Sequence, residues 1–152
     1  SRRCLRRTQS IITMLFPKKV KFRKWQRGRS NPKKKHVETR GIKLSFGSHG
    51  LKVLSFGRIS SNQIESGRRA ASRLLGKSGR AWVRVFPDIP ETKKGGELPM
   101  GKGKGDPYRF VAEVKPGRIL FEIDGVDDIT AREALRKAGT KISVKTAIVA
   151  RQ

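Results

Sequence analysis

Alternating apolar and polar positions along the chain predict six β-strands. The alternation is clearest in the third of them, where Ala81, Val83 and Val85 would share one face of the sheet. We expect the first two strands to form a hairpin around residues 47–50, and the fourth and fifth to form a hairpin around the proline–glycine turn at 115–117. The predicted strands span residues 41–46, 51–57, 80–86, 108–114, 118–123 and 142–149.

A second pattern, with apolar residues three and four positions apart, predicts two helices. The first spans residues 60–75 and begins with a capping box formed by Ser60 and Gln63. The second begins with a capping box at Thr130 and ends near Ala138. Because helices and strands interleave while hairpins dominate, we expect an α+β fold, a two-layer sandwich of a mixed or antiparallel sheet with both helices on one face.

The N-terminal part of the chain lacks both patterns. Residues 1–40 show no sustained helical or strand period, and Pro17 and Pro32 interrupt any that begins. We therefore expect a basic N-terminal extension and tail over residues 1–40, followed by a single α+β domain over residues 41–152.

The charge of the chain points to a polyanionic partner. Lys and Arg number 37 against 12 Asp and Glu, so the formal net charge is +25. Residues 1–87 hold 24 of the basic residues and 2 of the acidic ones, and no acid precedes Glu38. A solvated surface alone does not explain this imbalance, which is typical of nucleic-acid-binding proteins.

The sequence does not decide the cellular compartment of the protein. With Cys4 as its one cysteine, the chain can form no internal disulfide and suits a reducing compartment. No apolar run approaches the roughly 18 residues of a membrane span. The Arg-rich, acid-free residues 1–13 are either the remnant of an organellar transit peptide or a basic extension ahead of an original start at Met14, and we favour the second.

The residue types do not indicate a catalytic or metal site. His36, His49 and Cys4 are isolated from one another, and they are too few for a tetrahedral metal site. The acids within 124–128 lie at a predicted helix start, where negative charge favours the helix dipole. We expect neither a metal nor another cofactor. An RNA-modifying enzyme would need a cofactor loop or an activated nucleophile, and neither is visible.

The stretch Gly95–Pro107, GGELPMGKGKGDP, predicts a long loop between two strands. Loops of this length are usually functional or disordered. Its glycine and lysine spacing fits neither a Walker loop nor the dinucleotide fingerprint. Flexible glycines, backbone amides and lysines can instead follow an irregular phosphate path, so we expect recognition of RNA shape and backbone rather than of sequence.

Basic residues beside aromatic ones suggest that the tail also binds RNA, because aromatic rings and Arg stack on unpaired bases. Alternatively, Phe22 and Trp25 dock the tail on the core of the protein; the two interpretations are compatible. Three arginines on one face of the first helix would form a further phosphate-facing surface. The predicted RNA contacts are the side chains of Lys18, Lys19, Lys21, Arg23, Lys24, Trp25, Arg27, Arg29, Arg68, Arg69, Arg73, Arg84, Lys102 and Lys104, with the loop backbone at Met100, Gly101, Gly103 and Gly105.

From Met14 onward the chain resembles the universal large-subunit ribosomal protein L-sixteen family in its bacterial form. The resemblance covers almost all of residues 14–150, in the same order. The matching segments are MLFPKKVKFRKWQRGR (14–29), LSFGSHGLK (44–52), GRISSNQIESGRRA (57–70), WVRVFPDIP (82–90), PMGKGKGDP (99–107), and PGRILFEIDGV with AREALRKA (116–138).

This resemblance implies a structural constituent of the large ribosomal subunit with no catalytic group of its own. It implies binding to 23S rRNA near the peptidyl-transferase centre, contact with aminoacyl-site tRNA, and a role in late subunit assembly. Contacts with peptidyl-site tRNA and with 5S rRNA stay open, and other large-subunit proteins would be neighbours. The expected location is the ribosome in the bacterial cytoplasm, with the mitochondrial matrix or plastid stroma as alternatives, and without a membrane or a homo-oligomer. A non-ribosomal RNA chaperone is a further alternative.

The family's basic N-terminal segment matches Lys18–Arg29, and its RNA-facing loop matches Met100–Gly105. One departure concerns the loop entrance. Many members carry an arginine directly before the MGKGKG run, whereas this chain has Pro99, so any role of that arginine is lost here.

Overall fold

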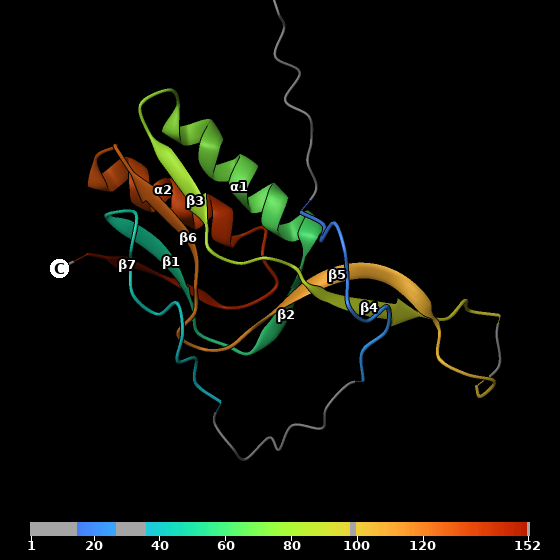
Figure 1. Ribbon diagram of the computed structural model, residues 1–152. Helices are drawn as coiled ribbons and strands as arrows, with labels where there is room; N and C mark the ends of the chain where they lie inside the picture. The colour runs from blue at the N-terminus through green and yellow to red at the C-terminus, as the bar shows by residue number, and fades with distance from the viewer. Residues whose placement is uncertain (1–14, 27–35, 98–99, 152) are drawn as a thin grey trace, which may run out of the picture.

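The computed structural model describes residues 15–26, 36–97 and 100–151. Within these ranges the chain folds into two antiparallel sheets and two helices (Figure 1). One sheet has four strands in the order β3-β6-β1-β7, and the other has three in the order β2-β5-β4. The elements are β1 (His49–Val53), β2 (Gly57–Ser60), α1 (Ser61–Leu75), β3 (Arg80–Val83), β4 (Ile89–Lys93), β5 (Asp106–Val114), β6 (Ile119–Asp124), α2 (Asp128–Gly139) and β7 (Thr146–Ala150).

The two helices pack against each other and against the four-stranded sheet, α1 beside β3 and α2 over β1, β6 and β7. Helix α1 lies close to the sheet at Gly67, where a Cβ would lie 3.1 Å from the ring of Phe121 in β6. The core between helices and sheet is fully apolar at its centre, with Leu51, Ile64 and Leu135 buried. The expected α+β class is therefore confirmed, with the strands divided between two sheets.

The three-stranded sheet carries the long loop away from this core. In Figure 1, β4 and β5 form a ribbon that projects from the body of the domain, and the loop joins their far ends. Neither helix in the described part of the chain is long and apolar enough to span a membrane.

The first predicted helix is confirmed together with its capping box. The Ser60 hydroxyl accepts a hydrogen bond from the Gln63 N–H at 3.4 Å, and the Gln63 side-chain oxygen accepts one from the Ser60 N–H at 3.0 Å. These bonds satisfy N–H groups that have no partner within the helix.

The second helix begins earlier than predicted. Its N-cap is Asp127, and the capping box expected at Thr130 is wrong, because the Thr130 hydroxyl instead donates to the Asp127 carboxylate at 3.2 Å. Asp128 in the first turn accepts from Arg132 at 2.7 Å, and its carboxylate lies 2.6 Å from His49 Nε2. The Arg132 bond, and after it His49, lowers the pKa of Asp128. Asp127 and Asp128 thus stabilise the start of α2.

The hairpin predicted around residues 47–50 is wrong. Residues 41–46 contain no strand, and β1 begins within the predicted turn and pairs with β6 and β7. The reason is the carboxylate of Glu122, which accepts hydrogen bonds from the backbone N–H groups of Ser45, Phe46 and Gly47. A side chain therefore occupies donors that a strand partner would otherwise use.

The turn at 115–117 forms as predicted, but the hairpin does not. The Arg118 N–H donates to the Lys115 carbonyl at 3.2 Å, and Gly117 has the positive φ of 103° that a type II turn requires. The two flanking strands then enter different sheets, because the Gly117 N–H and the Arg118 carbonyl both bond to Val53 at 2.8 Å. This docking on β1 replaces a direct β5–β6 ladder.

Strand β4 is absent from the strands predicted above, and it contains a proline, Pro90. Proline cannot donate to a ladder, so it is tolerated in a strand at the edge of a sheet. β4 is such an edge strand and pairs with β5 alone within the described residues. The loop therefore begins at the end of a strand whose last residue is Lys93.

Candidate nucleic-acid interface

The two segments predicted to bind RNA, the tail and the loop, lie against each other. The tail crosses the β4–β5 ribbon, and the Phe16 and Phe110 rings pack edge to face with centroids 5.9 Å apart (Figure 1). Further along, Lys24 Nζ donates to the Lys104 carbonyl at 3.0 Å. Lys104 Nζ in turn donates to the carbonyl of Trp25. The fold thus joins segments about eighty positions apart into one basic surface.

The aromatic residues of the tail are only partly covered. Trp25 is 43% exposed and Phe22 is 57% exposed, and neither belongs to the hydrophobic core cluster. The tail is docked instead by Leu15, which packs on the core, and by Phe16. Phe22 and Trp25 line a hollow of about 300 Å³ with Lys24 and Gln26, which leaves aromatic and cationic groups together at the surface.

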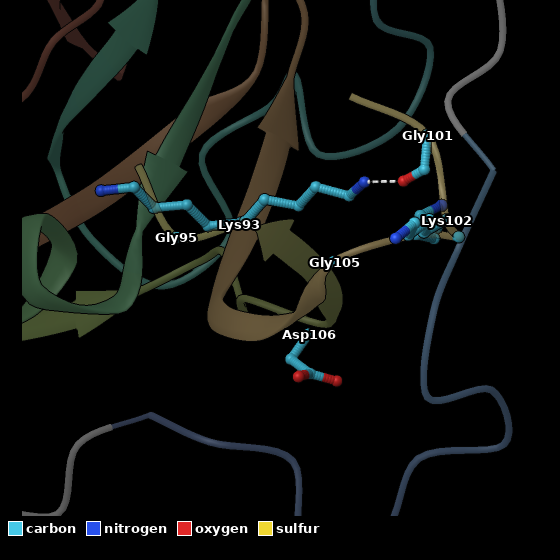
Figure 2. A pocket seen from close by; sticks show the side chains of 9 residues that line it. Lys93, Gly95, Gly101, Lys102, Gly105 and Asp106 are labelled. Carbon is cyan, nitrogen blue, oxygen red and sulfur yellow. Dashed lines mark hydrogen bonds between the residues drawn. The ribbon is translucent and has the colours of Figure 1, made fainter. Parts of the chain in front are cut away.

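The loop holds a small basic pocket of about 200 Å³ beside the ends of β4 and β5. Four lysines and one acid contribute to its wall. Its lining residues are Lys93, Lys94, Gly95, Gly101, Lys102, Gly103, Lys104, Gly105 and Asp106 (Figure 2). Because lysine ammonium groups outnumber the single carboxylate, the pocket favours an anion.

The loop backbone takes a conformation that suits glycine. Three consecutive residues have positive φ: Gly101 at 95°, Lys102 at 51° and Gly103 at 93°. Lys94 Nζ reaches back and donates to the Gly101 carbonyl, the bond drawn as a dashed line in Figure 2. The space around both glycines is open to 4 Å, so the main chain itself can approach a ligand closely.

The arginines of α1 are partly neutralised within the helix. Arg68 donates to Glu65 at 2.7 and 2.9 Å, and Arg69 donates to the same carboxylate at 3.0 Å. The Arg68 bond outweighs the effect of burial and lowers the pKa of Glu65. Arg73, one turn further, is exposed. This surface is therefore less positive than its three arginines alone suggest.

Arg84 is engaged inside the protein. Its guanidinium forms an ion pair with the buried carboxylate of Glu122 and lies 5.0 Å from the centroid of the Phe46 ring. Only 20% of its side chain is exposed. Its role as an RNA contact stays a prediction, while its contacts in this structure stabilise the fold around residues 45–47.

Arg27 and Arg29, together with Pro99 and residues 1–13, lie outside the described residues. In the described ranges, no group of three or more His, Cys, Asp or Glu is arranged to hold a metal ion.

Comparison with known proteins identifies the family. A family model described as ribosomal protein L16p/L10e matches residues 17–149. The chain belongs to this family. A large ribosomal subunit protein uL16 from Afipia carboxidovorans is 53% identical over 138 residues, which are 91% of this chain and 98% of that protein. Proteins of the same name from Maricaulis maris and Leptospira biflexa are 51% and 50% identical over the same shares.

Membership of the L16p/L10e family makes the chain a structural constituent of the large ribosomal subunit rather than an enzyme. Its partners are accordingly rRNA and other components of the ribosome. The named relatives are bacterial, so this L16p/L10e protein is of the bacterial type, in agreement with the expected location on the ribosome in the cytoplasm.

Several residues of this surface in the L16p/L10e chain were missed by sequence reasoning. Lys93 and Lys94 line the loop pocket, and they were overlooked because β4 itself was missed. Tyr108, exposed beside the loop, has Lys93 Nζ 5.5 Å from its ring centroid. Asp106 contacts the tail, and its signal was an acid directly after the GKGKG run in a chain that has no acid before Glu38.

Proposed function

We propose that the tail and the loop bind 23S rRNA and aminoacyl-site tRNA as one surface, near the peptidyl-transferase centre. The observation that supports this proposal is the contact between the two segments through Lys24, Lys104 and Trp25. It connects the tail segment that carries the exposed aromatic rings to Lys104, which lines the lysine pocket of the loop.

The chemistry of this surface fits a folded RNA strand. The lysines of the loop pocket meet phosphates, and the open glycine backbone allows the phosphate chain to come close. Phe22 and Trp25, next to Lys21 and Lys24, offer faces on which unpaired bases stack. Because few of these groups read base edges, binding depends on RNA shape.

The proposal includes a role in late assembly of the large subunit. A surface made of a tail and a loop needs an RNA cleft that other parts of the subunit have already formed. Neighbouring large-subunit proteins would cover other faces of the domain. Contacts with peptidyl-site tRNA and with 5S rRNA are finer alternatives.

Directed hydroxyl-radical probing tests the location. An iron chelate is attached at Gly96→Cys, a loop position with open space around it and no positive φ, in a Cys4→Ser background. The full chain is then rebound to salt-stripped large subunits from Afipia carboxidovorans, with aminoacyl-site tRNA added. We expect cleavage of 23S rRNA around the peptidyl-transferase centre and of the tRNA. The control is Lys141→Cys, at a residue just after α2, and it should give a different set of RNA cleavage sites. Cleavage only at distant rRNA from Gly96→Cys overturns the proposal.

Binding strength gives a second test. If about eight phosphates are contacted, log affinity for rRNA should fall against log salt with a slope near −6 to −7. A salt-independent affinity contradicts a phosphate-binding surface.

A further inference from the structure

Asp106 is an acid placed between two basic segments. It is the first residue of β5, and its side chain is 84% exposed. Lys24 Nζ lies 3.5 Å from its carboxylate, and Arg23 Nη2 lies 3.9 Å from it. Figure 2 shows Asp106 where the loop enters β5, apart from the outer arm that carries Gly101 and Lys102.

Lys24 also makes one of the two hydrogen bonds to backbone carbonyls that join the tail and the loop, and Lys104 makes the other. Lys24 Nζ donates to the Lys104 carbonyl at 3.0 Å, and Lys104 Nζ donates to the Trp25 carbonyl. Asp106 is two positions from Lys104, so its carboxylate attracts Lys24 toward the carbonyl that Lys24 binds. We call these four residues, Lys24, Trp25, Lys104 and Asp106, the tail–loop latch.

The latch needs its acid for an electrostatic reason. Lys24 and Lys104 carry like charges on two segments that contact each other, and their other latch partners are neutral carbonyls. Without a nearby negative charge, the two cationic segments repel each other. Asp106 supplies that charge, and each ammonium keeps further N–H donors for an external ligand.

We propose that Asp106 is a positioning residue for RNA binding, which holds the tail and the loop in one arrangement before RNA arrives. This inference rests on the proposed function, because it concerns the same surface. It adds that an acid within this surface favours binding. Preorganisation of this kind lowers the ordering cost that a flexible tail would otherwise meet on binding.

A role of Asp106 through its charge alone and a role in positioning the tail predict opposite changes in RNA affinity, so the inference can be tested. Replacing an acid by its amide raises the net positive charge by one. If Asp106 merely repels phosphate, Asp106→Asn should tighten RNA binding. If Asp106 positions the tail, the same substitution should weaken binding although the protein is more basic.

The experiment measures the affinity of the full chain for a large-subunit rRNA transcript from Afipia carboxidovorans at fixed salt. We expect Asp106→Asn to weaken binding about threefold, the scale of one or two exposed ion pairs, and Asp106→Glu to restore most of it. Glu97→Gln is the matched control, because Glu97 is exposed in the same loop and its substitution changes the charge equally. This control should bind as tightly as the unsubstituted protein or more tightly. Equal tightening by Asp106→Asn and Glu97→Gln overturns the inference.

A readout without RNA separates the inference from the proposed function. In a Trp82→Phe background, Trp25 is the remaining tryptophan, so its fluorescence anisotropy reports the motion of the tail. We expect Asp106→Asn, but not Glu97→Gln, to lower this anisotropy at an unchanged melting temperature. If the unsubstituted chain does not bind rRNA, the proposed function fails, and the anisotropy still decides whether Asp106 holds the tail. An unchanged anisotropy in Asp106→Asn overturns the inference.

Discussion

The guanidinium of Arg84 forms an ion pair with Glu122, a residue of β6 that is 0% exposed. The same carboxylate accepts backbone hydrogen bonds from Phe46 at 2.6 Å and Gly47 at 2.9 Å. One buried acid thus joins β6, the residue after β3 and the segment before β1. Its hydrogen bonds decide the path of the chain where strand-like sequence does not form a strand.

Replacing Glu122 by Gln should destabilise the fold. The amide can accept fewer of the three backbone bonds and leaves the Arg84 charge without its partner. Breaking a buried ion pair from one side costs about 3 to 5 kcal/mol, and we expect a loss near the lower end in the free energy of unfolding measured with urea. Glu113→Gln is the control, since Glu113 is exposed and pairs with Arg58 at 3.3 Å. A loss no larger than that of Glu113→Gln contradicts this role.

The stability of the protein should also fall in acid through Glu122. Burial alone would raise the pKa of Glu122, but hydrogen bonds from Gly47, Phe46 and Ser45 and the Arg84 charge outweigh it and lower the pKa. A carboxyl with a lowered pKa in the folded state stabilises fully above its ordinary pKa. That contribution is lost as the pH falls through the folded-state pKa.

The measurement is urea unfolding between about pH 6 and pH 3. The unsubstituted protein should lose more free energy of unfolding over this range than Glu122→Gln, which has no carboxyl to protonate. Glu65 and Asp128, whose pKa values are also lowered, titrate in both proteins and cancel in the comparison. Parallel curves for the two proteins would show that Glu122 does not contribute.

Substitution of Arg84 separates a folding role from an RNA contact. Arg84→Ala leaves the buried Glu122 carboxylate without its cation, so we expect a loss of about 3 kcal/mol in the free energy of unfolding. Arg84→Lys should lose less, because it keeps the charge but not the planar guanidinium. If the folded Arg84→Lys protein binds rRNA as tightly as the unsubstituted one, RNA binding does not need the guanidinium of Arg84. A tenfold loss at unchanged stability would instead support the predicted RNA contact.

The first helix, the presence of the second and the turn at Gly117 were predictable because their signals are local, whereas the start of the second helix was not. A capping box, a helical stripe and a proline–glycine turn depend on residues only a few positions apart. The strand partners were not predictable in this way. The segment before Gly47 bonds to Glu122, about 75 positions later, and no spacing near residue 47 records that contact.

The site was predicted in its parts but not in its connection. The basic tail and the Gly–Lys loop were recognisable from composition. Their contact through Lys24 and Lys104 spans 80 positions and depends on the projection of the β4–β5 ribbon. That ribbon includes β4, which was not predicted because Pro90 lies within it. The role of Asp106 depends on its contact with Lys24 of the tail, which its position in the sequence does not reveal.

Removing the two loop lysines should weaken RNA binding while the fold stays intact. Lys102 and Lys104 are exposed, so the double Ala variant should melt within a few degrees of the unsubstituted protein. We expect the slope of log affinity against log salt to become shallower by about 1 to 2, with weaker tRNA accommodation or later subunit assembly. Lys77→Ala with Lys141→Ala is the control for total charge. Unfolding of the loop variant would show that the loop supports the core.

A single methyl group tests the conformation of the loop backbone. Gly103 has φ of 93°, whereas Gly96 does not have a positive φ of this kind, and neither has an atom within 4 Å of where a Cβ would lie. Alanine at either position therefore meets no steric clash with the rest of the protein. Only Gly103→Ala imposes backbone strain, on the order of 1 to 3 kcal/mol, so we expect the loop to rearrange in this variant alone.

The rearrangement of the loop should weaken rRNA binding while the net charge stays the same. The melting temperature should also stay unchanged, because the loop lies outside the core. Amide hydrogen exchange of residues 100–105 should rise in Gly103→Ala and stay the same in Gly96→Ala. Equal affinities for the two variants would mean that the positive-φ backbone has no part in binding. The lysine side chains would then act from a loop of any shape.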